Sequence, residues 1–381
     1  MWSIGNEIKD KETAEVVEVC RELTGFVKTL DTTRPVTAGV NSIVDATDDF
    51  LAPLDVCGYN YCLNRYESDA KRHPDHIIYA SESYASQAYD KWKGVEDHSW
   101  VLGDFIWTAF DYIGEASIGW CGYPLDKRIF PWNHANCGDL NLSGERRPQS
   151  YLRETLWSDA PVSHIVVTPP VPSFPLNPDK ADWSVWDFPD VVDHWNFPGY
   201  EGKKMTVSVY SNCEQVELFL NGESLGKQEN TADKKNTLVW EVPYAHGILK
   251  AVSYNKGGEV GTATLESAGK VEKIRLSADR TEIVADGNDL SYITLELVDS
   301  KGIRNQLAEE LVEFSIAGDA TIEGVGNANP MSIESFVANS RKTWRGSNLL
   351  VVRSGKSSGR IIVTAKVKAL PVASITITQK K

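Results

Sequence analysis

The sequence predicts a multidomain protein in which a parallel α/β region over residues 1–160 precedes two all-β sandwiches, over 161–265 and 266–381. Two observations lead to this prediction. Up to about residue 160, short apolar runs alternate with longer amphipathic stretches, which is typical of strands that feed helices in a parallel sheet. Beyond that point, apolar and polar residues alternate one by one between Asn-Gly and Gly-Gly turns, as in antiparallel sandwiches.

The α/β region contains one clear helix, from about Lys11 to Leu30, which the following DTTRP ends. Its apolar residues repeat at intervals of three and four and predict one buried stripe, made of Val16, Cys20, Leu23, Val27 and Leu30. The buried strands expected next are PVTAG (35–39), LDVCGYNY (54–61), HIIYASES (76–83) and VLGDFIWTAFDY (101–112). A closing helix is expected at PQSYLRETLW (148–157).

The β region begins after a stretch with five prolines between residues 168 and 178, which excludes regular helix there. The strands expected first lie in MTVSVYSN (205–212), QVELFLNGESLG (215–226), NTLVWEVPY (236–244) and GILKAVSYNKGG (247–258). A second set begins at about residue 271, where strands and turns follow one another at intervals of about ten residues. We find no cluster of acids, His or Cys in either set, so any chemistry is expected in the first 160 residues.

Composition excludes several classes of function. The net charge of −14 argues against a nucleic-acid partner, since phosphate binding relies on clustered Lys and Arg. No run of about 18 apolar residues would span a bilayer, so no membrane span is expected. The six cysteines match no zinc or redox spacing and are expected to be free, mostly buried thiols. We expect no metal and no cofactor.

Two glutamates stand at the carboxyl ends of expected strands, Glu7 after WSIGN and Glu82 within YASES. Strand ends that are distant in the sequence converge on one edge of a parallel sheet or barrel. Two facing carboxyls suit glycoside cleavage, in which one protonates the leaving oxygen and the other attacks, and a separation of about 5–5.5 Å gives retention. Taken alone, Glu7 is better explained as a surface acid at a helix start, and Glu82 as a loop residue between capping serines; the two together favour the catalytic interpretation.

A set of motifs in this order resembles glycoside hydrolase family 2, the β-galactosidase and β-glucuronidase family. WSIGNE resembles the acid/base motif that ends the fourth strand of that family's (β/α)8 TIM barrel, and DVCGYNY, IIYASES and VLGDFIWTAFDYIGE resemble its sixth, seventh and eighth strands. VELFLNGESLG and WEVPYAHGILKAVSYNKGG resemble the sandwich that follows the barrel, and GVGNANPMSIESF with RKTWRGSNLLVVRSG resembles a C-terminal immunoglobulin-like module. The resemblance implies the C-terminal half of a barrel followed by two immunoglobulin-like sandwiches.

The resemblance also implies roles for individual residues. Glu7 would be the general acid/base and Glu82 the nucleophile of a retaining β-galactosidase-type exo-glycosidase. Asn6 would hold the sugar 2-hydroxyl, and Tyr61 would donate to the nucleophile, with Tyr59 as the alternative if the alignment slides by two.

Two further residues of the expected eighth strand would contact the sugar. Trp107 would stack under the pyranose ring, where a large apolar surface excludes water. Asp104 is a further expected contact to sugar hydroxyls. No NxKG element of the kind that glucuronidases use for the uronate follows Glu82, so the resemblance implies a neutral sugar. The expected substrate is an oligosaccharide or β-galactoside, because C-terminal modules of this type commonly follow galactosidase barrels, and a glucoside or mannoside is the alternative.

The chain departs from the family by starting at the fourth barrel strand. We therefore expect it to be a piece of a longer glycosidase whose N-terminal part acts as its partner, and to be inactive alone. The resemblance to bacterial polysaccharide-degrading relatives favours a periplasmic or extracellular location. The alternative from another class is a non-catalytic carbohydrate-binding or adhesion protein built on tandem β-sandwiches, with Trp183, Trp186 and Trp195 as its platform.

Overall fold

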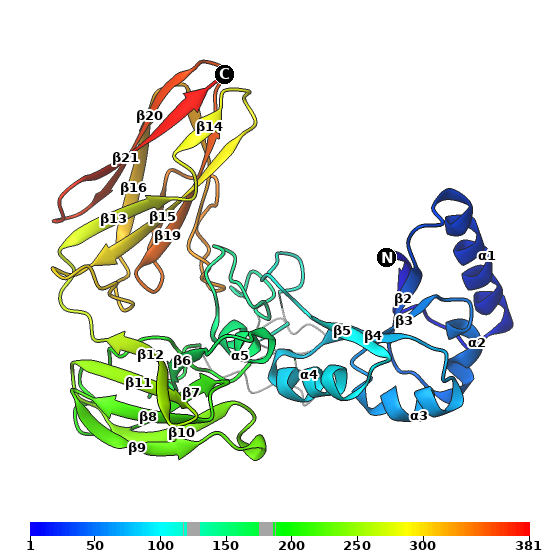
Figure 1. Cartoon of the computed structure of the whole chain (residues 1–381). Coiled ribbons are helices and arrows are strands. Elements are labelled where there is room, and N and C mark those ends of the chain that lie inside the picture. The colour runs from blue at the N-terminus through cyan, green and yellow to red at the C-terminus, as the bar shows by residue number, and fades with distance from the viewer. Residues whose placement is uncertain (117, 120–129, 175–185, 187) are drawn as a thin grey trace. The chain divides into compact units, whose positions relative to one another are not determined.

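The structure is a computed structural model that describes residues 1–116, 118–119, 130–174, 186 and 188–381. The chain forms two compact units. The first comprises residues 1–109 and 137–139 with the described residues of 182–189, and the second contains the other described residues. The chain is mostly β, with a small α/β part in the first unit (Figure 1).

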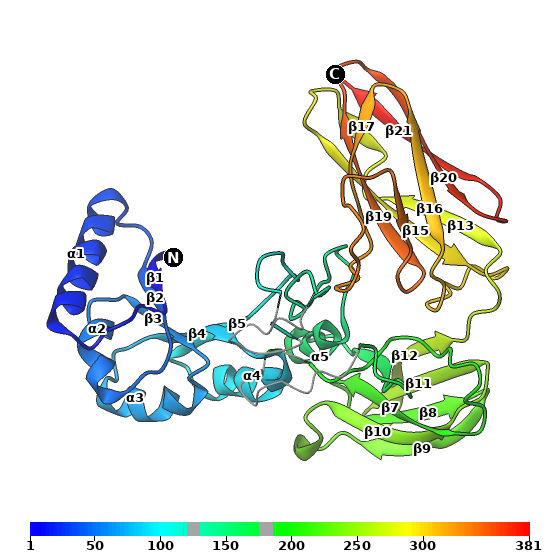
Figure 2. The same cartoon turned by 180° about the vertical axis from the view of Figure 1, so that it is seen from behind.

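The α/β part is built on one five-stranded sheet in the order β1-β2-β3-β4-β5, in which every neighbouring pair is parallel. Its strands are β1 (Trp2–Asn6), β2 (Val36–Val40), β3 (Val56–Asn60), β4 (Ile78–Ser83) and β5 (Val101–Ile106). The helices between them are α1 (Ala14–Leu30), α2 (Asp48–Leu51), α3 (Tyr66–Arg72) and α4 (Ala88–Asp97), with single 3-10 turns η1 (Asp45–Thr47), η2 (Leu63–Arg65) and η3 (Ala85–Gln87). These helices lie on the same side of the sheet, as Figures 1 and 2 both show.

The two faces of this sheet differ in character because side chains alternate along each strand. The face toward the helices is apolar and forms a core with α1, α2 and α3, in which the sheet contributes Ala38, Val40, Cys57, Tyr59, Ile78 and Val101. The opposite face carries polar side chains that bond to each other, such as Thr37, whose hydroxyl lies 3.2 Å from that of Tyr79. Chemistry is therefore confined to the face away from the helices and to the strand ends.

Helix α1 ends at Leu30 as expected, but it begins at Ala14, where Thr13 accepts a hydrogen bond from the N–H of Val16. The expected buried stripe is wrong in part. The helix buries Val17, Cys20 and Thr24, whereas Leu23 and Leu30 are exposed. The reason is that α1 carries two apolar stripes and packs only one of them on the sheet.

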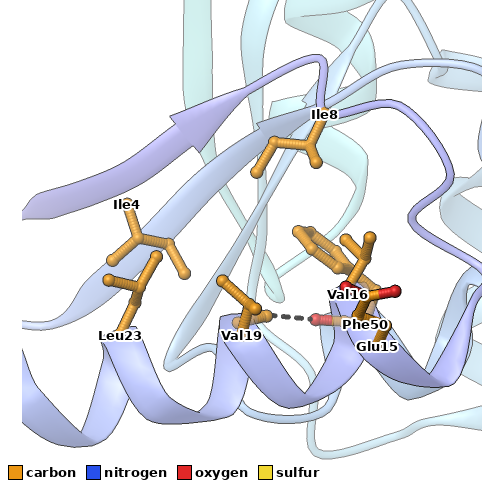
Figure 3. Close-up of a pocket in the computed structure, with 8 residues that line it drawn as sticks. Ile4, Ile8, Glu15, Val16, Val19, Leu23 and Phe50 are labelled. Atoms are coloured by element: carbon orange, nitrogen blue, oxygen red, sulfur yellow. Dashed lines mark hydrogen bonds between the residues drawn. The ribbon is translucent and has the colours of Figure 1, made fainter.

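The second stripe of α1 comprises Val19, Leu23, Phe26 and Leu30, which follow one another at helical spacing and are all exposed. Next to it, Ile4 of β1 and Ile8 after β1 face the helix around a cavity of about 200 Å³ that is apolar except for Glu15 (Figure 3). β1 is an outer strand of the sheet, since among the described residues it pairs only with β2. This edge thus combines an outer strand, whose other side has no partner strand among the described residues, with an apolar surface.

The expected strands of the α/β region are confirmed, except that β5 ends at Ile106 and not at Tyr112. Beyond it, Phe110 and Tyr112 make only isolated bridges, to Leu140 and Ala135. The expected closing helix is confirmed as α5 (Pro148–Trp157), with proline in its first turn.

The second unit contains four antiparallel or mixed sheets that enclose two separate cores. The first core lies between sheets β10-β7-β6 and β12-β11-β8-β9, whose strands are β6 (Ser163–Val167), β7 (Lys204–Ser211), β8 (Gln215–Leu220), β9 (Glu223–Glu229), β10 (Thr237–Pro243), β11 (Ile248–Asn255) and β12 (Gly258–Glu266). A 3-10 turn, η5 (Ala232–Lys234), precedes β10.

The second core lies between sheets β13-β15-β19-β17 and β14-β21-β20-β16-β18. Their strands are β13 (Lys273–Ala278), β14 (Glu282–Val284), β15 (Leu290–Val298), β16 (Leu311–Ala317), β17 (Ala320–Gly326), β18 (Ser340–Lys342), β19 (Ser347–Ser354), β20 (Gly359–Val367) and β21 (Ala373–Lys380). Two facing sheets around one core make each of these parts a β-sandwich.

Five cysteines are buried free thiols, as expected, and Cys121 lies outside the described residues. In the part of the chain that the structure describes, no helix has the length and apolar character needed to cross a bilayer. Nor does that part hold a group of three or more His, Cys, Asp or Glu side chains arranged to bind a metal ion.

Candidate active site

The register of the parallel sheet brings the carboxyl ends of its strands to one edge. Asn6 of β1 lies beside Gly39 of β2, and Asn60 of β3 lies beside Glu82 of β4. Each of these pairings follows a register shift, of the kind that a β-bulge makes. Such irregularities re-aim a side chain at the end of a strand and are common next to active sites.

Glu7 directly follows β1 and is half-buried. Its backbone N–H donates to the carbonyl of Gly39 at 2.8 Å, and its φ of 48° lies in the left-handed region. This conformation costs about 1 kcal/mol or more for a residue other than glycine and is found mainly where the surroundings impose it. The backbone thus turns away from the strand direction at the position of the carboxyl.

Glu82 lies at the end of β4, and only 9% of its surface is exposed. The hydroxyl of Tyr61 donates to its Oε2 at 2.7 Å. Burial raises the pKa of Glu82, and the negative charge of Glu7 raises it further, whereas hydrogen bonds from Tyr61, Asn60 and Asn6 lower it. The negative charge of Glu7 thus acts on the carboxyl of Glu82, so the two side chains lie near each other at this edge of the sheet.

Asn60, which the sequence did not single out, links the two carboxyl-bearing strand ends. It is fully buried, and its Nδ2 donates to Oδ1 of Asn6 at 3.0 Å and to Oε1 of Glu7 at 3.2 Å. Its own Oδ1 accepts from the hydroxyl of Ser81 at 2.5 Å. Because Oδ1 of Asn6 faces Asn60, the amide NH2 of Asn6 is turned toward Glu82.

Two glycines make room for this network. A Cβ on Gly39 would lie 3.0 Å from Oδ1 of Asn60 and even closer to Oδ1 of Asn6. A Cβ on Gly58 would lie 2.8 Å from the hydroxyl of Ser81 and would clash with the carbonyl of Ala38. A side chain at either position would force the hydrogen-bonded residues apart.

Tyr61 belongs to a group of three aromatic rings at the end of β3. Its ring stacks on Tyr84 with centroids 4.2 Å apart, and Trp186 stands edge-on to both rings. The backbone of Tyr61 has a φ of 60°, in the left-handed region like that of Glu7, and its N–H donates to the carbonyl of Glu82 at 2.8 Å. The bent backbone brings the hydroxyl to Glu82 instead of into the core.

Trp107 follows β5 directly, and its side chain is half-buried. Its backbone N–H donates to the carbonyl of Ser83 at 3.0 Å, which places its main chain next to the strand end that bears Glu82. The structure thus puts Glu7, Glu82, Asn6 and Tyr61 together and Trp107 at the neighbouring strand end.

Two of the expected site residues lie elsewhere. Tyr59 points into the core under the helices, and its hydroxyl donates to Asp69 at 2.9 Å, so the alternative to Tyr61 is wrong. Asp104 pairs with Ala80 in the sheet and is buried near Lys91 of α4, whose ionisation its charge affects. Tyr59 occupies a helix-facing position of the strand alternation, two residues after Cys57. In β5 the register shift between the Ile78–Val101 and Ala80–Asp104 pairs interrupts the alternation and turns Asp104 toward α4.

The structure describes two of the three tryptophans of the alternative, carbohydrate-binding hypothesis. Trp195 is fully buried in the first sandwich core, where its indole N–H donates to the carbonyl of Ala245 at 2.9 Å. Trp186 lies in the first unit, against Tyr61, and Trp183 lies outside the described residues. The buried ring of Trp195 thus offers no face to a sugar, and the ring of Trp186 packs against Tyr61 and Tyr84.

Sequence reasoning missed Asn60, Ser81 and Tyr84 and assigned Trp186 to a different role. Asn60 could have been predicted from the sequence, because it is an amide at the carboxyl end of an expected strand, like Asn6. For Trp186 we find no signal in the sequence, because its contact with Tyr61 joins residues 125 positions apart.

Comparison with known families gives two matches, both in the second unit. The family model described as "Glycoside hydrolase family 2 C-terminal domain 5" matches residues 274–376, in the second sandwich. A domain of unknown function, DUF4982, matches residues 202–261, in the first sandwich.

Curated relatives extend the likeness over the whole chain. Beta-galactosidase BoGH2A of Bacteroides ovatus is 29% identical over an alignment that covers 100% of this chain and 49% of that protein. A beta-glucuronidase of Formosa agariphila is 30% identical over 52% of this chain and 20% of its own length. The chain therefore spans half or less of the length of these relatives.

Solved structures show the same relation. A glycosyl hydrolase family 2 member from Bacteroides cellulosilyticus has 98% sequence identity and a TM-score of 0.98, over 100% of this chain and 49% of that one. A beta-glycosidase from Bacteroides vulgatus, with 23% identity and a TM-score of 0.76 over 99% of this chain, shares the fold. Together with the residues that carry the motifs, these matches identify the chain as a C-terminal portion of a glycoside hydrolase family 2 protein.

Proposed function

We propose that the chain is the C-terminal portion of a retaining exo-glycosidase of the β-galactosidase type, with Glu82 as nucleophile and Glu7 as general acid/base. In this proposal the five parallel strands are the fourth to eighth strands of a (β/α)8 barrel, and the two sandwiches follow it. The observation that supports it best is the hydrogen-bonded network at the strand ends, in which Asn60 contacts Glu7 and Tyr61 contacts Glu82.

The first step of the proposed reaction uses both carboxyls. Glu82 attacks the anomeric carbon while Glu7 gives its proton to the leaving oxygen, and a covalent glycosyl-enzyme forms. Burial raises the pKa of Glu82 overall, and the hydrogen bonds from Tyr61, Asn60 and Asn6 oppose this rise and so favour the ionised, nucleophilic form. A protonated Glu7 removes the charge that raises the pKa of Glu82, so the two required protonation states favour each other.

The second step reverses the role of Glu7. It takes a proton from water, which attacks the glycosyl-enzyme and releases the sugar with retained configuration. Asn6 is oriented to donate to the sugar 2-hydroxyl as the transition state develops, because its Oδ1 is held by Asn60. Trp107 would provide the apolar floor under the ring.

A terminal β-galactoside is the proposed substrate. The relative that aligns with the whole chain is named a beta-galactosidase, although a partial relative is named a beta-glucuronidase. The absence of an NxKG element after Glu82 supports the neutral sugar over the uronate.

The proposal also includes the N-terminal half of such a protein as the partner of this chain. Its docking surface would be the edge formed by β1 and the exposed stripe of α1 (Val19, Leu23, Phe26 and Leu30), where 62% of Phe26 and 74% of Leu30 are exposed. This chain covers 49% of the Bacteroides ovatus and Bacteroides cellulosilyticus proteins, so about half of each lies outside the alignment. Closing a (β/α)8 barrel needs eight strands, and the missing half would supply the remaining ones.

The test is to express the chain alone and together with the upstream part of the 98% identical Bacteroides cellulosilyticus protein. We expect no hydrolysis of an aryl β-galactoside by the chain alone and hydrolysis by the pair. Glu82→Gln should abolish turnover. Glu7→Gln should still allow attack on a substrate with an activated aryl leaving group, which needs no proton, and azide should then accelerate release of the sugar as a β-glycosyl azide.

Three outcomes would contradict the proposal in different parts. Turnover by the chain alone that disappears in Glu82→Gln would refute the need for a partner. Hydrolysis of an aryl β-glucuronide but not the galactoside would refute the sugar assignment. An inverted product would refute the double displacement.

A further inference from the structure

The hydroxyl of Tyr61 is held from two sides. It donates to Oε2 of Glu82 at 2.7 Å, and it accepts from the indole Nε1–H of Trp186 at 2.9 Å. An indole N–H can only donate, so the Tyr61 oxygen must be the acceptor in the second bond. The proton of the hydroxyl is then left to point toward the carboxylate.

Ring packing holds the indole in this position. Trp186 meets the ring of Tyr61 at 88° and the ring of Tyr84 at 81°, while Tyr61 and Tyr84 stack on each other. Such edge-to-face contacts are favourable beyond the apolar area they bury. Burial of the group also strengthens the two hydrogen bonds, which polarise one another when they form a chain.

We propose that Trp186 is a positioning residue, whose indole N–H fixes the orientation of the Tyr61 hydroxyl so that its proton is directed at Glu82. A role of Trp186 in catalysis rests on the proposed function, in which Glu82 is the nucleophile. The orientation of the Tyr61 hydroxyl by Trp186 does not depend on that function. Trp186 follows the last strand of the parallel sheet by some 80 residues, so a residue from outside the sheet contributes to the site.

The proposal has a consequence for the ionisation of Glu82. Among the described residues, the titratable groups that shift the pKa of this carboxyl are Tyr61, whose hydrogen bond favours the charged form, and Glu7, whose charge opposes it; Tyr84 also lies within reach of the charge on Glu82. If Trp186 keeps the Tyr61 hydroxyl proton directed at Glu82, loss of the indole N–H weakens the hydrogen bond that favours the carboxylate. The pKa of Glu82 must then rise. A merely structural role for Trp186 would not move it.

The test is a titration of the 381-residue chain with 13C-labelled glutamate carboxyls, with the signal of Glu82 assigned through Glu82→Gln. Trp186→Phe keeps an aromatic ring and removes the N–H. We expect it to raise the titration midpoint of Glu82 by about 0.5 pH unit, a fraction of the effect of a direct partner. In a Tyr61→Phe background the same change should have no further effect.

A matched control is Trp92→Phe, which removes an indole N–H that donates to Glu96 on the exposed side of α4 at 3.1 Å. It should leave the midpoint of Glu82 unchanged. If packing in Trp186→Phe is disturbed, the indole proton resonance of Trp186 reports the same bond from the other side, and it should shift upfield in Tyr61→Phe.

An unchanged Glu82 midpoint in Trp186→Phe, or a shift that persists without the Tyr61 hydroxyl, would overturn the inference. An unmoved indole resonance in Tyr61→Phe would do the same. Neither readout depends on hydrolysis, so failure of the proposed function would appear separately, as absent turnover by the assembled protein with the titration shift intact.

Discussion

The side-chain amide of Asn60 donates a hydrogen bond to Oε1 of Glu7 at 3.2 Å, across 53 positions of the sequence. The same nitrogen also lies 3.0 Å from Oδ1 of Asn6. One buried amide on β3 thus orients both residues that end β1, and through Asn6 it reaches the surroundings of Glu82. The orientation of Asn6 and Glu7 therefore depends on the hydrogen bonds from Asn60.

Asn60→Ala should therefore destabilise the chain. It removes hydrogen bonds to Glu7, Asn6 and Ser81 and leaves their polar atoms unsatisfied, which we expect to cost about 2–4 kcal/mol of the free energy of unfolding. Urea denaturation at 25 °C measures this loss. Asn64→Ala, an exposed position just beyond the same strand, is the control and should change stability by less than about 0.5 kcal/mol. Equal effects of the two variants would show that the network carries no stability.

Glu82→Gln should stabilise the chain at neutral pH. Because the pKa of Glu82 is higher in the folded than in the unfolded state, its contribution to stability is present below the unfolded pKa and is lost as pH rises through the folded pKa. Glutamine does not titrate and can still accept the Tyr61 hydrogen bond. The variant should thus melt at a higher temperature than the parent at pH 7, and the difference should vanish below about pH 4, where unfolded Glu is protonated.

Glu22→Gln on the exposed side of α1 is the control for that experiment, and it should change the free energy of unfolding by less than about 0.5 kcal/mol at pH 7. A Glu82→Gln variant that is less stable than the parent at pH 7 would mean that the hydrogen bonds to the carboxylate outweigh the cost of its burial.

Gly58→Ala and Gly25→Ala should have opposite effects. A Cβ at Gly58 clashes with the carbonyl of Ala38 on the neighbouring strand, whereas a Cβ at Gly25 on α1 meets nothing within 4 Å. We expect Gly58→Ala to cost about 1–3 kcal/mol and Gly25→Ala to gain about 0.5–1 kcal/mol from helix propensity. Thermal unfolding of the two variants tests the close approach of β2 and β3, which a neutral Gly58→Ala would contradict.

Replacing Phe26 and Leu30 by Gln should weaken binding of the N-terminal half without changing the stability of the chain itself. Both side chains are exposed in the chain, so its own urea stability should change by less than about 0.5 kcal/mol. If the N-terminal half covers them, its affinity should fall at least about 10-fold, since burial of one large apolar side chain contributes about 1.5–3 kcal/mol. Sedimentation of the mixed halves measures this, and unchanged affinity would place the docking surface elsewhere.

Asp104→Asn should affect stability and not substrate binding. Both Asp104 and Lys91 are buried, and the negative charge of Asp104 favours the charged form of Lys91, so its loss leaves a buried cation less well compensated, at an expected cost of about 1–3 kcal/mol. Asp97→Asn, at the exposed end of α4, is the matched control. A raised KM of the assembled enzyme in Asp104→Asn, without loss of stability, would return this residue to the sugar site.

Local patterns in the sequence were sufficient for most of the architecture. The strict alternation of the sandwich strands, the proline-led helix at 148–157 and the four strands after α1 all follow from periodicity and turn residues. The positions of Glu7 and Glu82 at strand ends follow from the same patterns, because the ends of parallel strands share one edge of the sheet.

Only the tertiary structure decided which neighbouring residues face the site. Tyr59 and Tyr61 are both compatible with the sequence pattern, and the register shift at the end of β3 and the left-handed backbone of Tyr61 separate them. Helical periodicity likewise finds apolar stripes on α1 without showing which one the sheet covers.

Asn60 and Trp186 illustrate the same division. Their roles consist of contacts with residues 53 and 125 positions away, which strand pairing and ring packing create. The sequence by itself determined that Glu7 and Glu82 lie at strand ends, since a strand end is a local feature. The hydrogen bonds that orient this pair were decided by the tertiary structure, because they depend on which distant side chains the packed sheet brings within about 3 Å of each other.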